Sequence, residues 1–418
     1  MKITGNSRRT FLKSALAGSA VLYFPQSVLG REGAVSPNEK IVLGGIGIRS
    51  RGTYVLNCFL PEKEVRFAAI ADVRKDRRLA VKELAEKTQG TNDVAMYRDF
   101  RELLDRRDID AVLIATGDRW HAHASIYAAR AGKDVYSEKP CAISIDLCNK
   151  LAETMRQCGT VFQGGTQRRS VWNFQYACAL AQSGKLGKIH TVHASIYYMN
   201  QRTDWLPAQP IPDREELDWD LWLGPAPWRP FNMAYCNGAW RGFDDFDSGA
   251  RHLDWGAHTV DLCQWALGMD GTMPVRYWAE GDRAYAEYEN GVKLVMRPNG
   301  WLGLGTCPIR LEGTDGWVET GDTGRMVVSS APLYSTEKTI AGTNAKTHVR
   351  NFLDCVPTRQ QPVCNAEVIR SSHIACHASA LSWLLKRELK MDPQTATFLN
   401  DDEANRLRYR ASREPWMV

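Results

Sequence analysis

The sequence predicts an α/β fold that begins with a doubly wound parallel sheet and continues into an α+β domain with a large, mostly antiparallel, open-faced sheet. Three observations support this fold class. From residue 40 onward, apolar runs alternate with helical stretches, as in a parallel sheet with helical crossovers. The first apolar run ends in a glycine-containing turn that leads into a helix. After residue 160, long alternating strands and short hairpin turns replace this pattern.

The strands of the first sheet are expected where apolar residues follow one another with few charges. They lie at residues 40–45, 65–73, 109–116 and 134–138, with a weaker one at 94–97. Helical patterns occupy residues 76–87 and 121–131 between them. We expect this first domain to cover residues 38–160.

The second domain is expected to cover residues 161–418. Residues 188–199 form a long alternating strand, and residues 284–297 form a hairpin that turns at Asn290-Gly291. A further hairpin turns at Asp315-Gly316. Residues 200–250, rich in Pro, Trp and Asp, are interpreted as a long ordered insertion over the cleft.

Composition excludes several classes of protein. The chain of 418 residues carries 53 basic and 48 acidic residues without a basic block, so no nucleic-acid partner is expected. Its 11 cysteines follow no regular spacing, which favours buried free thiols over a disulfide framework. Near the C-terminus, Cys364, His373, Cys376 and His377 lack a paired C-x-x-C knuckle, so no metal site is expected.

The N-terminus, residues 1–33, is interpreted as a twin-arginine signal peptide. Lys2, Arg8 and Arg9 are basic, and residues 14–24 form an apolar stretch too short to span a bilayer. Residues 7–13, Ser-Arg-Arg-Thr-Phe-Leu-Lys, match the export motif. We therefore expect the Tat export machinery as a partner, a periplasmic or otherwise exported mature protein, and no membrane association after signal removal. Because this route carries folded proteins, it suits a tightly held cofactor.

The turn after the first strand resembles the dinucleotide-binding fingerprint of a Rossmann domain. Glycines are needed there for the tight turn, for approach to a pyrophosphate and for packing of helix on strand. Ser50 stands where the third glycine is usual and is small enough for the packing role. The predicted cofactor-binding residues of this turn are Gly45, Gly47, Ile48, Arg49 and Ser50.

Asp72 ends the second strand, where a carboxylate accepts hydrogen bonds from the adenosine ribose and repels a 2′-phosphate. It favours NAD over NADP, although Arg74 and Lys75 lie close behind. The alternative is that Asp72 is only a turn residue.

The segment from Ala111 to Pro140 contains Ile114-Ala115-Thr116, Asp118-Arg119-Trp120-His121 and Glu138-Lys139-Pro140. With these motifs it resembles the glucose–fructose oxidoreductase, inositol dehydrogenase and rhizopine catabolism (Gfo/Idh/MocA) family. The resemblance continues through residues 164–169, 219–225 and 254–258. One departure is Gly117, where the family often has proline.

The resemblance implies that Lys139 is catalytic and that Pro140 forms a cis bond. It also implies that Thr116, His121, Glu138 and Lys139 contact the cofactor. An ammonium group at this sheet edge can stabilise the negative charge that develops on a substrate oxygen. The alternative is a surface lysine that pairs with Glu138.

Asp254 and His258 are four residues apart in the helical stretch 253–267, so both side chains can point into one cleft. The resemblance implies that they flank the substrate hydroxyl, with His258 as the acid–base. Asp261 is expected to orient the imidazole or to cap a neighbouring element. The alternative is a solvated helix face.

Several other residues carry weaker predictions. His121 and His123 have a spacing that suits metal ligands, but no third ligand follows, so His121 is placed near the cofactor loop and His123 is taken as structural. Planar donors and indole rings suit polyhydroxylated ligands. The substrate contacts proposed on that basis are Arg168, Arg169, Trp240 and Arg241, each with a structural alternative.

These observations support three hypotheses of function. The first is NAD-dependent hydride transfer at a secondary hydroxyl or ketone of a sugar, glycoside or cyclic polyol. The second is a redox-neutral sugar enzyme with tightly bound NAD, which oxidises its substrate transiently to allow elimination, epimerisation or glycoside cleavage. The third is a non-catalytic protein that binds sugar or dinucleotide. The resemblance also implies a homodimer or homotetramer formed through the open sheet.

Overall fold

The computed structural model describes residues 39–334 and 345–418 of the chain. The predicted signal peptide, residues 1–33, lies outside the described residues. Residues Ile41–Val418 form one compact unit. In this described part, no helix combines the length and the apolar character that a membrane crossing requires.

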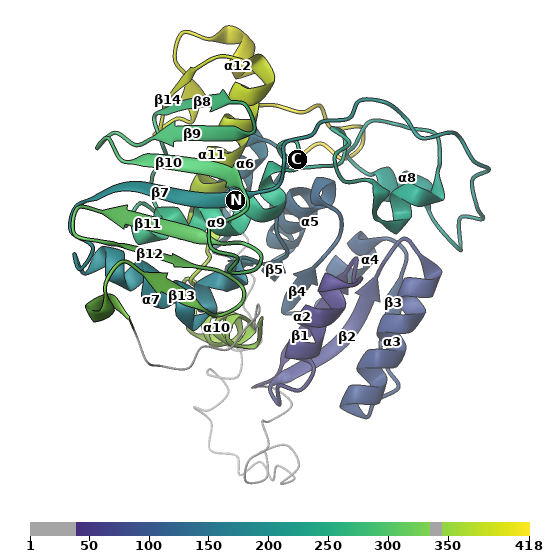
Figure 1. Cartoon of the computed structure of the whole chain (residues 1–418). Helices are drawn as coiled ribbons and strands as arrows, with labels where there is room; N and C mark the ends of the chain where they lie inside the picture. The colour runs from purple at the N-terminus through teal and green to yellow at the C-terminus, as the bar shows by residue number, and fades with distance from the viewer. Residues whose placement is uncertain (1–38, 335–344) are drawn as a thin grey trace, which may run out of the picture. The chain divides into compact units, whose positions relative to one another are not determined.

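Six parallel strands of the described chain form the first sheet, in the order β3-β2-β1-β4-β5-β6 (Figure 1). Their bounds are β1 Ile41–Ile46, β2 Val65–Ala71, β3 Ala95–Tyr97, β4 Ala111–Ile114, β5 Asp134–Ser137 and β6 Phe162–Gly164. The strand order reverses between β1 and β4, which marks the ligand-binding edge of a doubly wound sheet. The predicted fold class is confirmed, and β6 extends this sheet beyond residue 160.

Helices cover both faces of the first sheet. One face packs against α2 Arg51–Phe59, α3 Lys75–Gln89 and α10 Ala345–Thr358. The other packs against α4 Phe100–Leu104, α5 Asp118–Arg130 and α6 Ile145–Cys158. Helix α5 begins three residues before the predicted helix, because Gly117 is extended and Asp118 opens the first turn. Since α10 comes from the C-terminal half, the two halves of the chain share a hydrophobic core.

Nine strands of the described chain form the second sheet, in the order β13-β12-β11-β7-β10-β9-β8-β14-β15. Their bounds are β7 Ile189–Ile196, β8 Arg276–Glu280, β9 Arg283–Glu287, β10 Lys293–Pro298, β11 Ile309–Gly313, β12 Trp317–Thr320, β13 Met326–Val328, β14 Leu389–Asp392 and β15 Thr397–Phe398. Strands β7 and β10 pair in parallel and the other neighbours are antiparallel. The predicted hairpins β9–β10 and β11–β12 are confirmed.

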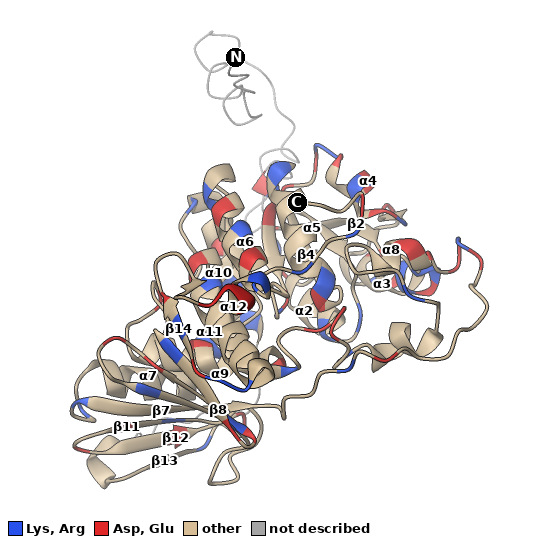
Figure 2. Ribbon diagram, turned by 90° about the horizontal axis from the view of Figure 1, so that it is seen from above, with Lys and Arg blue, Asp and Glu red and all other residues tan. Residues whose placement is uncertain are grey.

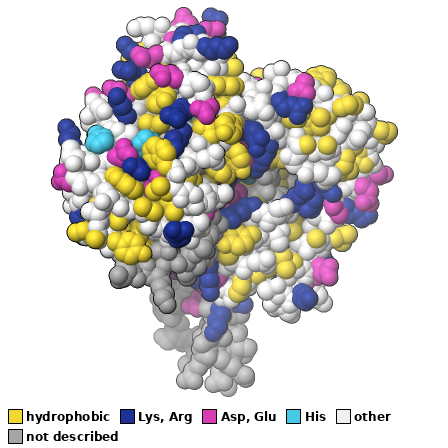
Figure 3. Space-filling model, viewed as in Figure 1, with side chains coloured by type: hydrophobic (Ala, Val, Ile, Leu, Met, Phe, Trp, Pro, Cys, Tyr) yellow, Lys and Arg dark blue, Asp and Glu magenta, His cyan; other side chains and the backbone are white. Residues whose placement is uncertain are grey.

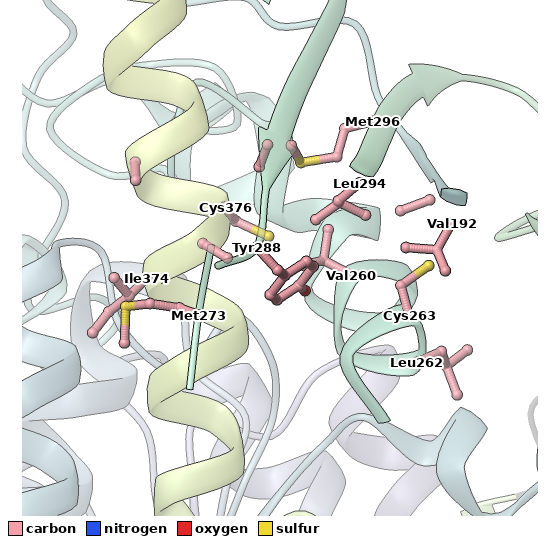
Figure 4. Close-up of a cluster of buried hydrophobic side chains, with 14 of the residues drawn as sticks. Val192, Val260, Leu262, Cys263, Met273, Tyr288, Leu294, Met296, Ile374 and Cys376 are labelled. Atoms are coloured by element: carbon pink, nitrogen blue, oxygen red, sulfur yellow. The ribbon is translucent and has the colours of Figure 1, made fainter. Parts of the chain in front are cut away.

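One face of the second sheet packs against α7 Trp172–Gln182, α9 His252–Ala266 and α11 Ala366–Leu385. Figure 4 shows part of this core, in which Val260 and Cys263 of α9 lie near Leu294 of β10 and Cys376 of α11. Figure 1 shows the opposite face of the sheet without helices over it. The packing fixes α9, and with it Asp254 and His258, beneath the sheet.

Residues 197–251, between β7 and α9, form the insertion. It has a small core of its own that includes Trp219, Trp222, Tyr235 and Phe243. Within it lie α8 Trp219–Leu223 and the short helix η4 Tyr235–Ala239. Backbone hydrogen bonds from Lys75 N to Glu216 O and from Asp218 N to Val73 O attach the insertion to the residues that follow β2.

All eleven cysteines lie in the described part of the chain, and none of them forms a disulfide there. Basic and acidic residues are interspersed along the elements (Figure 2). The remaining short helices are η3 Gln167–Ser170, η5 Ala331–Leu333 and α12 Asp402–Arg406.

Candidate active site

Two cavities meet at the carboxyl edge of the first sheet. The first, of about 150 Å³, lies beyond the ends of β1, β2 and β4 and is called the dinucleotide cavity below. The second, of about 550 Å³, is called the catalytic cavity and lies between this edge and helix α9. Ala115 and Thr116, which follow β4, line both cavities. A ligand that spans the two cavities would therefore pass these two residues.

The turn after β1 is longer than the predicted fingerprint. Gly47 has φ +69°, and a Cβ added there would lie 2.4 Å from Thr116 Cγ2. A Cβ added at Gly52 would lie 2.7 Å from that of Ala115, so Gly52 performs the helix–strand packing assigned to Ser50. Ser50 instead precedes α2 with φ +37°. The assignment of Ser50 as the packing residue is thus corrected, because two more residues lie in this loop than the fingerprint assumes.

The residues of this turn have different surroundings. Gly47 and Arg49 line the dinucleotide cavity. Ile48 is buried in the core beneath α2, and a Cβ added at Gly45 would meet the Phe67 ring at 2.9 Å. Ile48 and Gly45 therefore shape the turn from behind.

Asp72 lines the dinucleotide cavity at the end of β2. Its Oδ1 accepts a hydrogen bond of 2.9 Å from the backbone N–H of Arg74. Burial raises the pKa of Asp72 to about 6, against the effect of nearby Arg77 and Arg74. The carboxylate therefore fits both interpretations of Asp72, because it closes a turn and also faces the cavity where a ribose would bind.

The cations near Asp72 are mostly engaged elsewhere. Arg74 binds Asp76 through two hydrogen bonds of 2.9 and 2.6 Å, and Lys75 Nζ lies 2.6 Å from Glu216. Arg77 lines the cavity, and its buried Nε has no hydrogen-bond partner among the described residues.

The dinucleotide cavity has hydrogen-bond donors and apolar walls that suit a dinucleotide. Two buried donor atoms at the cavity, Arg77 Nε and Arg119 Nη1, have no hydrogen-bond partner within the described chain and can serve oxygen or nitrogen acceptors. The apolar and aromatic lining residues suit the flat face of a base or nicotinamide. They are Ile46, Val73, Phe100, Trp120, Leu221, Trp222 and Trp240.

Lys139 lies in the catalytic cavity with its charge already paired. Its Nζ donates to Asp254 Oδ1 at 3.0 Å and to the Asp254 backbone carbonyl at 2.6 Å. Burial alone would raise the pKa of Asp254, but Lys139 and Arg241 bring it below its ordinary value. Asp254 is therefore a carboxylate that holds the ammonium group in place. The bond between Lys139 and Pro140 is cis.

His258 is buried at the same cavity. Its Nδ1 has no hydrogen-bond partner in the described part of the chain. Burial, together with the charges of Arg168 and Lys139, lowers the pKa of His258 well below its usual value. The imidazole is therefore neutral near pH 7 and can accept a proton.

Two family models match most of the described chain. Residues 40–166 match the NAD-binding Rossmann fold of an oxidoreductase family, and residues 185–418 match the C-terminal α/β domain of the same family. The chain belongs to the Gfo/Idh/MocA oxidoreductase family.

Curated relatives of this family member have different activities. It is 29% identical over 150 residues to a myo-inositol 2-dehydrogenase of Thermotoga maritima, covering 36% of this chain and 43% of that one. It is 30% identical over 118 residues to a 2,7-anhydro-N-acetylneuraminate hydratase of Mediterraneibacter gnavus, covering 28% and 30%. The chain thus matches less than half the length of each relative.

A solved structure is similar in fold. Scyllo-inositol dehydrogenase from Lactobacillus casei, with bound NAD(H) and scyllo-inositol, superposes with a TM-score of 0.58 at 18% identity. The match covers 84% of this chain and 99% of that one. At this identity the likeness supports the fold alone.

In this family member, the four predicted substrate contacts separate into three groups. Arg168 and Arg241 line the catalytic cavity, where Arg168 binds Asp322 at 2.8 and 2.5 Å. Trp240 lines the dinucleotide cavity instead. Arg169 lines neither cavity, because its buried guanidinium is held by Asp261 and Asp270.

That contact also corrects the role expected for Asp261. Its two carboxylate oxygens each accept a hydrogen bond of 2.8 Å from Arg169. The structure records no hydrogen bond between Asp261 and His258, whose Nδ1 has no partner among the described residues. Asp261 thus fixes α9 to η3 through Arg169 and does not orient the imidazole.

Three histidines hold the backbone that follows Lys139. His121 Nδ1 lies 2.6 Å from Pro140 O, His373 Nε2 accepts from Cys141 N at 3.1 Å, and His377 Nε2 lies 3.1 Å from Ala142 O. His373 and His377, weighed above as metal ligands, therefore contact the protein backbone. In the described residues no group of three or more His, Cys, Asp or Glu side chains is arranged to hold a metal ion.

His121 and His123, two residues apart, differ in surroundings. His121 lines the catalytic cavity, whereas His123 Nε2 lies 3.1 Å from Ser412 Oγ in the C-terminal tail. Burial lowers the pKa of His123 to about 4.

Further residues of the catalytic cavity were not singled out from the sequence. They are Arg51, Asp118, Trp255, Thr306 and Asp322. Asp118 and Trp255 lie in segments that resemble the family, but Thr306 and Asp322 come from loops of the second sheet with no local motif. Glu138, a predicted cofactor contact, accepts a hydrogen bond of 2.6 Å from Gln167 Nε2, and its carboxylate lies 3.6 Å from Arg51 Nε.

Proposed function

We propose that this protein is an NAD-dependent oxidoreductase acting on a secondary hydroxyl or ketone of a sugar, glycoside or cyclic polyol. The observation that carries the proposal is the meeting of the two cavities at Ala115 and Thr116, with Lys139 and His258 on the catalytic side. The bound nicotinamide supplies the hydride acceptor or donor. The activity of the myo-inositol dehydrogenase relative agrees with this substrate class.

The residues of the catalytic cavity supply the proton chemistry. The Lys139 ammonium donates a hydrogen bond to the substrate oxygen and stabilises the negative charge that grows on it. Neutral His258 accepts the hydroxyl proton during oxidation and returns it during reduction. Asp254 holds Lys139 through the 3.0 Å contact, so the ammonium group is in position before substrate enters.

A polyhydroxylated substrate fits the remaining lining. Arg168 and Arg241 present planar donors, and Asp118, Glu138 and Asp322 present carboxylate acceptors. Each hydroxyl group of a sugar or polyol can donate one hydrogen bond and accept others. The mixture of both signs therefore suits a neutral polyol better than an apolar ligand.

A second candidate keeps the cofactor bound through each cycle and oxidises the sugar only transiently. The insertion favours it, because it fastens to the edge of the dinucleotide cavity. Arg49 Nη1 donates a hydrogen bond of 2.7 Å to Cys236 O, and Arg119 Nε donates one of 2.8 Å to Trp222 O. The Arg119 guanidinium also lies 3.6 Å from the centre of the Trp222 ring. The name of the hydratase relative also describes a reaction without net oxidation.

One experiment separates these candidates. The purified full-length protein is denatured, and the released nucleotide is identified by mass spectrometry. Sugars and polyols are then mixed with native protein while absorbance at 340 nm is followed. Release of NAD on denaturation, with a rise in absorbance at 340 nm limited to one equivalent of NADH per chain, supports the retained cofactor. Turnover that requires added NAD supports the dehydrogenase. Absence of NAD binding and of any absorbance change would leave only the non-catalytic alternative.

We also propose that residues 1–33 direct export through the twin-arginine route, which rests on the Ser-Arg-Arg-Thr-Phe-Leu-Lys sequence. Replacing Arg8 and Arg9 together by Lys should retain the protein in the cytoplasmic fraction. Unchanged export of this double variant would contradict the proposal.

The open face of the second sheet supports a homodimer or homotetramer. Trp278 and Tyr285 stack there at 5.3 Å, and Arg310 lies 4.7 Å from the Trp301 ring. Light scattering of the purified protein should give a mass of two or four chains. A monomer at micromolar concentration would contradict this assembly.

A further inference from the structure

We propose that His121 is a second catalytic base, which removes a proton from the substrate carbon next to the transiently oxidised carbon. The inference rests on the proposed function, in particular on its transient-oxidation form. It concerns a side chain to which the proposed hydride transfer gives no part in moving protons, since Lys139 and His258 already supply the groups for the hydroxyl proton.

The contact with Pro140 fixes which nitrogen of His121 carries the proton. A carbonyl oxygen only accepts, so Nδ1, 2.6 Å away, must donate to it. The other nitrogen, Nε2, then carries a lone pair in the neutral ring. Ser125 Oγ donates a hydrogen bond of 2.6 Å to the His121 carbonyl, which also fixes the backbone of His121.

The lone pair of Nε2 is buried and has no hydrogen-bond partner among the described residues. His121 is 2% exposed, and it lines the catalytic cavity together with Lys139 and His258. Of the three histidines that hold residues 140–142, His373 and His377 do not line this cavity. An unpartnered buried acceptor is costly unless a ligand completes it.

The charges around the two cavity histidines differ in sign. Burial lowers the pKa of His121, and the carboxylates of Asp118 and Glu138 oppose this shift while Arg241 adds to it. Burial lowers the pKa of His258 further, with Arg168, Lys139, Arg51 and His348 all acting in the same direction. A proton taken from carbon is therefore better stabilised on His121 than on His258.

The step balances without an added reagent. After oxidation of the carbinol to a ketone, the neighbouring C–H bond is acidified. His121 Nε2 takes that proton, and the C–H electron pair becomes the C=C bond of an enolate whose oxygen is stabilised by Lys139. Return of a proton from the imidazolium regenerates the ketone. If an oxygen substituent lies on the next carbon, its departure with the bonding pair and that proton gives an elimination.

Isotope exchange tests this role in the full-length protein with its bound dinucleotide. Protein in D₂O is mixed with glucose, galactose, N-acetylglucosamine, myo-inositol and methyl glycosides of the three sugars. Absorbance at 340 nm reports oxidation, and NMR reports deuterium in the carbon-bound positions. We expect deuterium next to the oxidised carbon of whichever compound reduces the dinucleotide.

The variant His121→Asn keeps a side-chain N–H near the Nδ1 position for Pro140 but lacks Nε2. The ratio of isotope exchange to dinucleotide reduction should fall by about 10²-fold or more in this variant. The control His123→Gln keeps a donor toward Ser412 and should leave both signals unchanged.

Three outcomes would overturn the assignment. Exchange at the wild-type rate in His121→Asn would show that another group is the base. Reduction without exchange in wild type would remove this step and leave the proposed function standing. Failure of every compound to reduce the dinucleotide would overturn the proposed function and this step together.

Discussion

The two cavities adjoin but are built on different principles. The dinucleotide cavity has aromatic and aliphatic walls, and three of its basic residues, Arg49, Arg74 and Arg119, bind carbonyls or carboxylates of neighbouring elements. Arg77 Nε and Arg119 Nη1 have no hydrogen-bond partner among the described residues. The catalytic cavity is lined by charges of both signs and two neutral histidines. Figure 3 shows basic side chains along the hollow of the surface beside the second sheet. One cavity thus offers apolar walls with two unpaired donors, and the other prepares groups for proton transfer.

This difference makes the two cavities separable by mutation. Changes in the catalytic cavity should affect the reaction and leave dinucleotide binding intact. Changes around the dinucleotide cavity should alter affinity or retention and leave the chemistry of a bound cofactor intact. The following variants test that separation.

The largest effect is expected for Lys139→Ala. Loss of the ammonium group removes the stabilisation of the substrate oxygen, and hydride transfer should fall by about 10³-fold. The nucleotide released on denaturation should be unchanged in identity and amount. Loss of both signals would mean that Lys139 belongs to the binding site, contrary to the separation.

Gly47→Ala should weaken dinucleotide binding and stability, with Gly90→Ala as its matched control. Both glycines have similar φ, +69° and +66°, but only Gly47 lies against Thr116, whereas nothing lies within 4 Å of a Cβ at Gly90. Gly90→Ala should cost about 1 kcal/mol of unfolding free energy for the backbone conformation. Gly47→Ala should cost a further ~1–3 kcal/mol for crowding. Denaturant unfolding measures the stability of both variants, and NAD titration measures their affinity. Equal effects in the two variants would refute the close contact between Gly47 and Thr116.

Arg49→Gln should loosen the insertion over the dinucleotide. Loss of the 2.7 Å hydrogen bond to Cys236 O should speed NAD dissociation by about tenfold. Lys75→Gln is the control, because its ion pair with Glu216 is exposed and should change dissociation by less than about threefold. Release of the reduced dinucleotide can be followed by its fluorescence during a chase with excess oxidised nucleotide, and equal rates for the two variants would argue against retention by Arg49.

The smallest effect concerns pH. Because the pKa of Asp72 is raised to about 6, its carboxyl is largely protonated at pH 5 and ionised at pH 7. The ionised form accepts hydrogen bonds from the ribose more strongly, so NAD affinity should rise by a few-fold between these values. Calorimetric titration of wild type and Asp72→Asn measures this, and the slope should vanish in the variant. A slope that persists would assign the titration to another group.

Much of the fold was predictable because its signals are local. The Asn290-Gly291 turn, the alternating strand before the insertion and the four-residue spacing of Asp254 and His258 each lie within one short segment. The position of Gly52 was missed, because a fingerprint presumes a loop length that only the packing against Ala115 reveals.

The rest of the site depends on contacts between distant segments. Asp322 reaches the catalytic cavity from the second sheet, and Arg51 reaches it from the first turn of α2. Arg169 and Asp261 pair across 92 positions of sequence, which removes both from the roles assigned to them. Pairings of this kind are set by tertiary packing and leave no periodic pattern in the sequence.

In the proposed reaction, hydride passes between the two cavities at Ala115 and Thr116, with Lys139 beside the reacting carbon. The most direct measurement mixes the protein with myo-inositol and sugars deuterated at their carbinol carbons, then weighs the released dinucleotide. We expect a reduced dinucleotide that is one deuterium heavier than that formed from unlabelled compounds, and loss of this label in Lys139→Ala. A dinucleotide that is never labelled by any of these compounds, or labelling that persists in Lys139→Ala, would contradict it.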